Sequence, residues 1–245
     1  MAGQAMGIMG IEKQWFPWKS ESIQSGRPAI FTGCNAVLFM PETVQMVLGI
    51  LGKHQYGWIY DCCGKPLDRT EAGTVGIQRL ENRIQKHKIS EIAVFCPNCY
   101  YYLKGKLSVP VVPLYDSLKR EGILPQKSLS EATLFIPCPD RAEKTMLGSM
   151  ERWLGQTFAS TYAGSCCGLA QSDSEGPRSS IQRIKNLNQK MRPYCASCFG
   201  QFRNHGISHS PHVLSEVFGI EEGPITVPSR ILNRIRPLRW KKQGV

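Results

Sequence analysis

The stretch Ile92-Ala93-Val94-Phe95-Cys96-Pro97-Asn98-Cys99 joins a short apolar run directly to a Cys-x-x-Cys pair. A run of this length, rich in β-branched and aromatic residues, predicts a buried strand. The same order, an apolar run followed by cysteine, recurs along the chain. The other predicted strands are residues 28–31 before Cys34, 58–60 before Cys62, 133–136 before Cys138, 160–162 before Cys166 and 191–194 before Cys195.

All ten cysteines belong to one pattern that the chain uses twice. Each copy has a lone cysteine, a Cys-Cys-Gly triplet and a Cys-x-x-Cys pair. The triplet follows the lone cysteine by 28 positions in both copies. Adjacent cysteines cannot bridge each other without severe backbone strain, which disfavours a disulfide framework. The first set is Cys34, Cys62, Cys63, Cys96 and Cys99; the second is Cys138, Cys166, Cys167, Cys195 and Cys198.

Helical patterns between the predicted strands place each cysteine set in an α/β unit. Pro41 at a first-turn position is followed by Val44, Val47, Leu48 and Leu51 at helical spacing. Strands that alternate with helices favour a parallel sheet, whose ligands gather beyond the carboxyl ends of the strands. We therefore expect an α/β fold of two pseudo-symmetric Rossmann-like domains. Each would have a small, mostly parallel sheet flanked by helices.

Two repeats of about 100 residues cover most of the chain. The expected organisation is an N-terminal extension over residues 1–27, a first domain over 28–124, a second over 131–220 and a basic C-terminal tail over 221–245. The linker is predicted at residues 122–131.

Composition limits the classes of protein and partner. The chain has 245 residues and a formal net charge of +11. We see no secretory signal in its first 28 residues, and its longest apolar stretch, residues 36–52, is too interrupted to predict a spanning helix. We expect a cytoplasmic, reducing location, where clustered cysteines are metal ligands or redox centres more often than disulfides. The chain lacks a recognised nucleic-acid motif, so no nucleic-acid partner is expected.

Sulfur-only ligand sets select zinc, copper(I) or iron–sulfur clusters. Zinc and an ordinary cubane cluster each take four ligands, so five cysteines per set is one more than either needs. The fifth would bridge two irons, remain a reactive thiol or be structural. Gly64 and Gly168 follow the cysteine pairs. They mark either a close approach of the backbone to inorganic sulfide or an ordinary tight turn.

The doubled arrangement of lone Cys, Cys-Cys-Gly and Cys-x-x-Cys resembles the cysteine-rich CCG-domain family over residues 28–220. That family includes the B subunit of heterodisulfide reductase and related oxidoreductase subunits. The resemblance implies two CCG domains related by pseudo-twofold symmetry. It also implies that each five-cysteine set binds a [4Fe-4S] cluster, noncubane in the best-understood relatives, that splits or forms a disulfide substrate.

The chain departs from the family pattern in its second half. The gap from the pair to the Cys-x-x-Cys is 28 positions there against 33 in the first half, and Pro193 interrupts the strand that leads to Cys195. Some relatives hold zinc in one repeat, which makes a mixed zinc and iron–sulfur protein the alternative for that site. The ferredoxin-type run of closely spaced cysteines is absent from the sequence. We therefore expect a partner subunit that carries ferredoxin-type clusters or flavin.

Two other polar residues are weak catalytic candidates. His212 lies 14 positions after Cys198 and would donate to a cluster sulfur or serve as a proton source; the alternative is a polar residue that starts a helix. Lys65, which follows the first Cys-Cys-Gly, would offset cluster charge or hold an anionic substrate. A solvated loop lysine is equally consistent with the sequence.

The C-terminal tail is basic, and Ile231, Leu232 and Ile235 share one side of a helical pattern in it. It would dock on an acidic partner, associate peripherally with a membrane or simply be solvated. Nucleic-acid binding by this tail is the alternative ranked last, because no recognised nucleic-acid motif accompanies it. For the whole chain, the resemblance to the CCG-domain family implies an iron–sulfur oxidoreductase subunit that transfers electrons to a disulfide or quinone-like acceptor. The alternative is a zinc-stabilised scaffold or assembly protein without redox activity.

Overall fold

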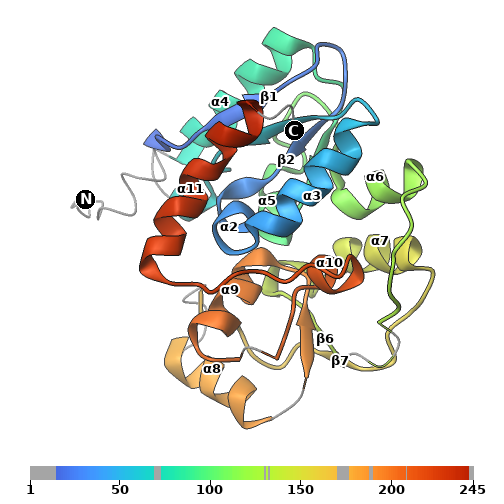
Figure 1. The fold of residues 1–245 in the computed structure, drawn as a ribbon, viewed down its shortest axis with the longest axis vertical. Helices are drawn as coiled ribbons and strands as arrows, with labels where there is room; N and C mark the ends of the chain where they lie inside the picture. The colour runs from blue at the N-terminus through green and yellow to red at the C-terminus, as the bar shows by residue number, and fades with distance from the viewer. Residues whose placement is uncertain are drawn as a thin grey trace.

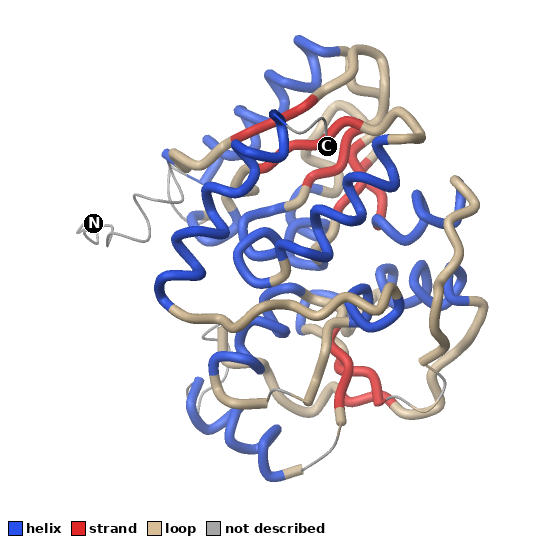
Figure 2. The backbone as a smooth tube through the Cα atoms, viewed as in Figure 1, coloured by secondary structure: helices blue, strands red, loops and turns tan. Residues whose placement is uncertain are grey.

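The computed structural model describes residues 15–68, 73–129, 131, 133–169, 177–187, 190–207 and 209–242. Two separate sheets flanked by helices confirm the expected α/β class, and Figure 2 shows their strands as two groups. In Figure 1 the unit built around the first sheet lies above the unit built around the second.

The first sheet contains all the strands predicted before cysteines in the first half of the chain. β2 (Ala29–Phe31) lies between β3 (Gly57–Tyr60) and β4 (Ile92–Val94), and β5 (Val111–Pro113) follows β4. These four strands run parallel. β1 (Ser20–Ser22), from the N-terminal extension, adds an antiparallel edge strand beside β3.

Helices flank the first sheet, and all but the last of them connect its strands as crossovers. They are α2 (Gly33–Phe39), α3 (Pro41–Gly52), α4 (Gly73–His87), α5 (Pro97–Leu103) and α6 (Leu114–Arg120), with a 3₁₀ turn η1 at Lys65–Leu67. The predicted helical spacing after Pro41 is confirmed, because Val44, Val47, Leu48 and Leu51 are all buried.

The second sheet is smaller and entirely parallel. β6 (Thr133–Phe135) lies between β7 (Thr161–Tyr162) and β8 (Met191–Pro193). Pro193 is the last residue of β8, so it ends the strand rather than excluding it. The helices are η2 (Cys138–Asp140), α7 (Thr145–Leu154), α8 (Pro177–Asn186), α9 (Ala196–Asn204) and α10 (Val213–Val217).

The two units pack through the segments that carry their cysteines. α2, which follows β2, lies on α9, and α5 lies on η2. Gly200 permits the first contact, since a Cβ there would lie 2.4 Å from the Phe39 ring. Each lone-cysteine segment therefore faces the Cys-x-x-Cys helix of the other unit.

The C-terminal segment is a packed helix, α11 (Val227–Lys242), that returns to the first unit and lies along β1, α2 and α3 (Figure 1). Its Trp240 is buried edge-to-face against Trp58. Within the residues that the structure describes, no single helix is long and apolar enough to cross a membrane. The pair α2 and α3 reaches that length and composition, but the two helices meet at a bend of 115°.

Candidate cysteine-rich metal site

The six cysteine-bearing segments meet where the two units face each other. Each follows the carboxyl end of one of the strands β2, β3, β4, β6, β7 and β8. All ten cysteines are free thiols; Cys34 and Cys138 are half-buried, and the other eight are buried. Parallel pairing thus places cysteines that are far apart in sequence at one edge of each sheet, as the sequence predicts.

In the first set, the Cys63 sulfur accepts hydrogen bonds from the thiols of neighbouring cysteines. Hydrogen bonds from Cys62 and then Cys99 lower the pKa of Cys63 to about 5. The pKa of Cys99 is raised well above its usual value, because its hydrogen bond to Cys63 favours the protonated thiol. The half-buried Cys34 interacts electrostatically with Cys63. Neighbouring thiols therefore hold Cys63 as a thiolate near neutral pH.

The second set repeats this arrangement. Hydrogen bonds from Cys166 and then Cys198 lower the pKa of Cys167 to about 4. The hydrogen bond to Cys167 raises the pKa of Cys198 well above its usual value. Cys138 interacts electrostatically with Cys166. In both sets, the second cysteine of the Cys-Cys-Gly triplet favours the thiolate. The Cys-x-x-Cys pairs differ, because hydrogen bonds with Cys195 and then Cys99 lower the pKa of Cys96 well below its usual value, whereas the pKa of Cys195 is raised.

The two sets touch each other. The Sγ atoms of Cys96 and Cys195, each at the N-cap of its helix, lie 3.8 Å apart. The Asn98 side-chain amide donates to the Cys195 sulfur at 3.6 Å. Asn35 Nδ2 donates to Ser197 Oγ at 2.7 Å, which joins the lone-cysteine segment of one unit to the Cys-x-x-Cys turn of the other. The contact between Cys96 and Cys195 makes the two sets one continuous sulfur cluster across the interface.

The donor set is suited to a thiophilic metal, but the thiols as they lie contact one another. Among the described residues, no three His, Cys, Asp or Glu side chains are arranged around a position for a metal ion. Cys63 and Cys167 already favour the deprotonated form that a metal ligand requires. The residue types therefore fit zinc or an iron–sulfur cluster.

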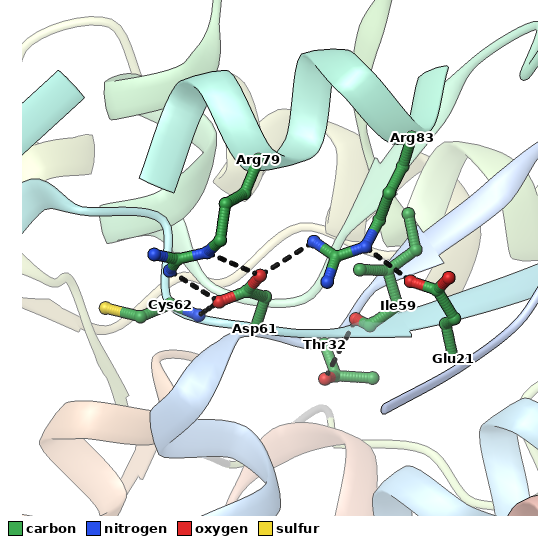
Figure 3. Close-up of polar contacts among 7 residues, drawn as sticks. All are labelled: Glu21, Thr32, Ile59, Asp61, Cys62, Arg79 and Arg83. Carbon is green, nitrogen blue, oxygen red and sulfur yellow. Dashed lines mark hydrogen bonds and ion pairs between the residues drawn. The ribbon is translucent and has the colours of Figure 1, made fainter. Parts of the chain in front are cut away.

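A buried carboxylate fixes the first Cys-Cys-Gly turn (Figure 3). Asp61, which is 1% exposed, accepts the Cys62 backbone N–H at 2.7 Å. Arg79 contacts both of its oxygens, at 2.7 and 3.1 Å, and Arg83 Nη1 donates at 2.7 Å. Arg83 also pairs with Glu21 on β1. The sequence analysis missed this network, although an acid directly before the triplet and two arginines four positions apart could have indicated it.

The second unit has an arginine at the equivalent position but a serine in place of the aspartate. Ser165 stands directly before Cys166, where Asp61 stands before Cys62. Arg183 Nε donates to Ser165 Oγ at 3.3 Å, and Arg141 Nη2 donates to the Ser165 carbonyl at 2.5 Å. The second triplet is therefore preceded by a neutral serine, whereas a buried carboxylate precedes the first.

The glycines of the two triplets are required by backbone conformation. Gly64 and Gly168 have φ angles of +90° and +87°. A Cβ on Gly64 would lie 2.6 Å from the Gly73 carbonyl oxygen, and one on Gly76 would lie 2.8 Å from the Cys62 carbonyl oxygen. The start of α4 thus packs backbone to backbone on the triplet. The tight-turn interpretation accounts for Gly64, while Gly73 and Gly76 were missed despite their Gly-x-x-Gly spacing.

His212 is buried at the start of α10. Its Nδ1 accepts the Leu214 N–H at 3.2 Å, so it is the N-cap of that helix, as the helix-start alternative predicts. Burial lowers its pKa to about 4. The neutral ring therefore carries its proton on Nε2, and a contact with the Tyr194 backbone partly opposes the lowering of the pKa. The ring lies edge-on to Phe199, close enough to Cys96 to interact electrostatically.

Lys65 contacts the Cys-x-x-Cys turn of its own unit rather than lying free in solvent. Its Nζ donates to the Asn98 side-chain oxygen at 3.0 Å. The same Asn98 amide donates to the Cys195 sulfur. Lys65 therefore orients an amide that contacts the sulfur cluster.

Asp140 holds the two units together behind the sulfur cluster. Its buried carboxylate accepts the hydroxyls of Tyr101 and Tyr194, both at 2.6 Å, and the N–H groups of Met146 and Leu147. Burial and, as the second cause, the hydrogen bond to the Asp140 carboxylate raise the pKa of Tyr101 to about 12. The Tyr101 hydroxyl therefore stays protonated and remains a hydrogen-bond donor. Tyr101 comes from α5 of the first unit and Tyr194 directly precedes Cys195. Sequence reasoning gave no sign of this connection.

Comparisons with known proteins leave the family open. No family model and no curated protein matches the chain. Among solved structures, it is similar to an aspartate racemase from Picrophilus torridus, with 9% identity, a TM-score of 0.40, and coverage of 85% of this chain and 100% of that one. A periplasmic solute-binding protein of an ABC transporter from Actinobacillus succinogenes 130z, solved with D-allose, has 11% identity, a TM-score of 0.28 and coverage of 76% and 77%. Likenesses at this level carry no inference about function.

Proposed function

We propose that the chain is an iron–sulfur oxidoreductase subunit resembling the B subunit of heterodisulfide reductase. The observation that carries the proposal is the meeting of all six cysteine-bearing segments at one interface, with Cys96 and Cys195 sulfurs 3.8 Å apart. Buried free thiols from two units that favour thiolates at equivalent positions support metal ligation over a disulfide framework.

Each set of five cysteines would hold one [4Fe-4S] cluster, which supplies one-electron transfer when bound. The neighbouring residues have defined tasks. Asn98 donates an N–H to sulfur at the centre of the interface, and His212 offers a second buried N–H donor beside it. Hydrogen bonds to ligand sulfur and a dry surrounding shell tune a reduction potential. The buried rings of Tyr100, Tyr102 and Phe199 exclude water next to the Cys-x-x-Cys turns.

A partner and a substrate complete the proposal. A subunit with ferredoxin-type clusters or flavin would deliver electrons to the interface. A disulfide or quinone-like acceptor would be reduced there, in the cytoplasm. The acceptor would approach the half-buried Cys34 and Cys138, since the other eight cysteines are buried.

The direct test is anaerobic purification with iron, sulfide and zinc analysis and an EPR spectrum of the reduced protein. We expect iron and acid-labile sulfide in the purified or reconstituted chain. Cys63→Ser and Cys167→Ser should each lose the iron of one set and keep that of the other. The matched control is Ser197→Ala, which changes the second Cys-x-x-Cys turn without removing a sulfur and should retain iron.

Two results would contradict the proposal. One is a protein with no iron and no sulfide after reconstitution. The other is stoichiometric zinc with no visible absorbance, which would favour the zinc-stabilised scaffold instead.

A further inference from the structure

Helix α11 presents an apolar stripe to solvent. Val227, Ile231 and Leu238 are 69%, 54% and 51% exposed, and their spacing places them on one side of the helix. Leu232 is 55% exposed but lies roughly 100° around the helix from Ile231, outside this row. We call Val227, Ile231 and Leu238 the α11 stripe. Single exposed apolar residues are common on proteins, but a row on one helix face marks an interaction surface.

The opposite face of α11 is the one that binds the first unit. Trp240 packs against Trp58, and Asn233 Nδ2 donates to the Leu38 carbonyl at 2.9 Å. Pro237 is buried, and its carbonyl accepts from Ser20 on β1. The rotation of the helix is therefore fixed by packing, and the stripe faces outward while α11 stays docked.

Cations border the stripe and α11 contains no acid. The helix carries six basic residues: Arg230, Arg234, Arg236, Arg239, Lys241 and Lys242. Arg236 pairs with Glu42 of α3, whereas Arg239, next to Leu238, is exposed. A helix with this charge distribution is complementary to an anionic surface, and long basic side chains can cover apolar area while their charges remain in water.

We propose that α11 is an interfacial helix that lays its stripe into an anionic lipid surface and holds the protein peripherally on a membrane. An exposed aliphatic row flanked by basic residues is found on helices that lie in the headgroup region. The stripe contains only Val, Ile and Leu, whereas the centres of protein interfaces are enriched in Trp, Tyr and Arg. α11 also lies at the outer edge of the molecule, where a flat surface can reach it (Figure 1). The inference is independent of the metal content.

Vesicle co-sedimentation of the full chain tests the inference. The wild type should bind vesicles of phosphatidylcholine mixed with phosphatidylglycerol, bind phosphatidylcholine alone much more weakly, and detach as salt is raised. Ile231→Glu and Leu238→Glu should each weaken binding by at least about tenfold, because an apolar side chain is lost from the buried face. Arg239→Gln should weaken it about fivefold.

Leu124→Glu is the matched control, since Leu124 is 77% exposed and lies outside α11. It should bind like the wild type, and all variants should keep the wild-type circular dichroism spectrum because the changed positions are exposed. The inference is overturned if the wild type does not bind the mixed vesicles at low salt, or if Ile231→Glu and Leu238→Glu bind undiminished. A wild-type dimer that Ile231→Glu converts to monomer, without vesicle binding, would assign the stripe to a protein interface and overturn it as well.

Discussion

At the scale of single residues, Asp61 is the buried charge on which the first Cys-Cys-Gly turn depends. Asp61→Asn would leave Arg79 and Arg83 around a neutral amide, and both arginine side chains are mostly buried. Removing one partner of such a network should lower the free energy of unfolding by about 3 kcal/mol. Urea titration in the presence of a reductant measures this loss in the free energy of unfolding.

The matched control for Asp61 is an exposed ion pair. Glu143 pairs with Lys104 at 2.8 Å, and both side chains are about half exposed. Glu143→Gln should therefore cost less than about 1 kcal/mol. An equal loss in the two variants would contradict the structural role assigned to Asp61.

His212 should make the stability of the protein sensitive to acid. Its folded pKa of about 4 lies below the unfolded value of 6.5, so the unfolded chain binds more protons between these values. The stability that the neutral His212 ring contributes is present above pH 6.5 and is lost as the pH falls toward 4. Between pH 7 and pH 5 the wild type should lose about 2 kcal/mol more than His212→Gln. Equal pH profiles in urea titrations of the two proteins would refute this assignment.

At the scale of elements, a pair of glycine substitutions distinguishes the close packing of α4 on the Cys-Cys-Gly turn from the cost of backbone strain. Gly64 and Gly26 both have positive φ, so alanine costs conformational energy at either position. A Cβ at Gly26 meets nothing within 4 Å, whereas one at Gly64 meets the Gly73 carbonyl. Gly64→Ala should destabilise the protein by about 1–3 kcal/mol more than Gly26→Ala. Equal melting temperatures would show that α4 does not approach the turn so closely.

Most helices and strands follow from local pattern, and the exceptions have physical causes. The strands before the cysteines form because short apolar runs can be buried on both faces of a parallel sheet. β1 has no such pattern in Ser20-Glu21-Ser22, and it pairs because β3 leaves an edge open to it. The basic composition after Pro228 predicts a tail, but burial of Trp240 against Trp58 stabilises this segment as a docked helix.

At the scale of the whole molecule, the two units should unfold together. Asp140 of the second unit binds Tyr101 of the first, and Glu222 accepts the N–H groups of Glu42 and Thr43 at the start of α3. α11 also connects the end of the chain to the first unit. Far-UV circular dichroism and tryptophan fluorescence should therefore report one coincident urea transition.

Tyr101→Phe tests this coupling. The hydroxyl donates to the Asp140 carboxylate and accepts the Thr145 N–H at 3.1 Å. Its loss should lower the unfolding free energy by about 2 kcal/mol and shift both signals together. Tyr194→Phe, which removes a bond to the same carboxylate from within the second unit, is the control. Two separated transitions in the wild type would contradict the coupling.

The sequence by itself determined the α/β class, the two five-cysteine sets and the strand that precedes each cysteine segment, because periodicity and spacing are local properties. It also predicted that each set gathers at a sheet edge, since parallel strands leave their carboxyl ends together. Tertiary structure alone decided that the Cys96 and Cys195 sulfurs meet, that Asp61 and Asp140 fix the surrounding turns, and that α11 turns its aliphatic row outward. These features depend on contacts between residues that are distant in sequence. The energies of such contacts come from burial and desolvation, which local sequence patterns do not predict.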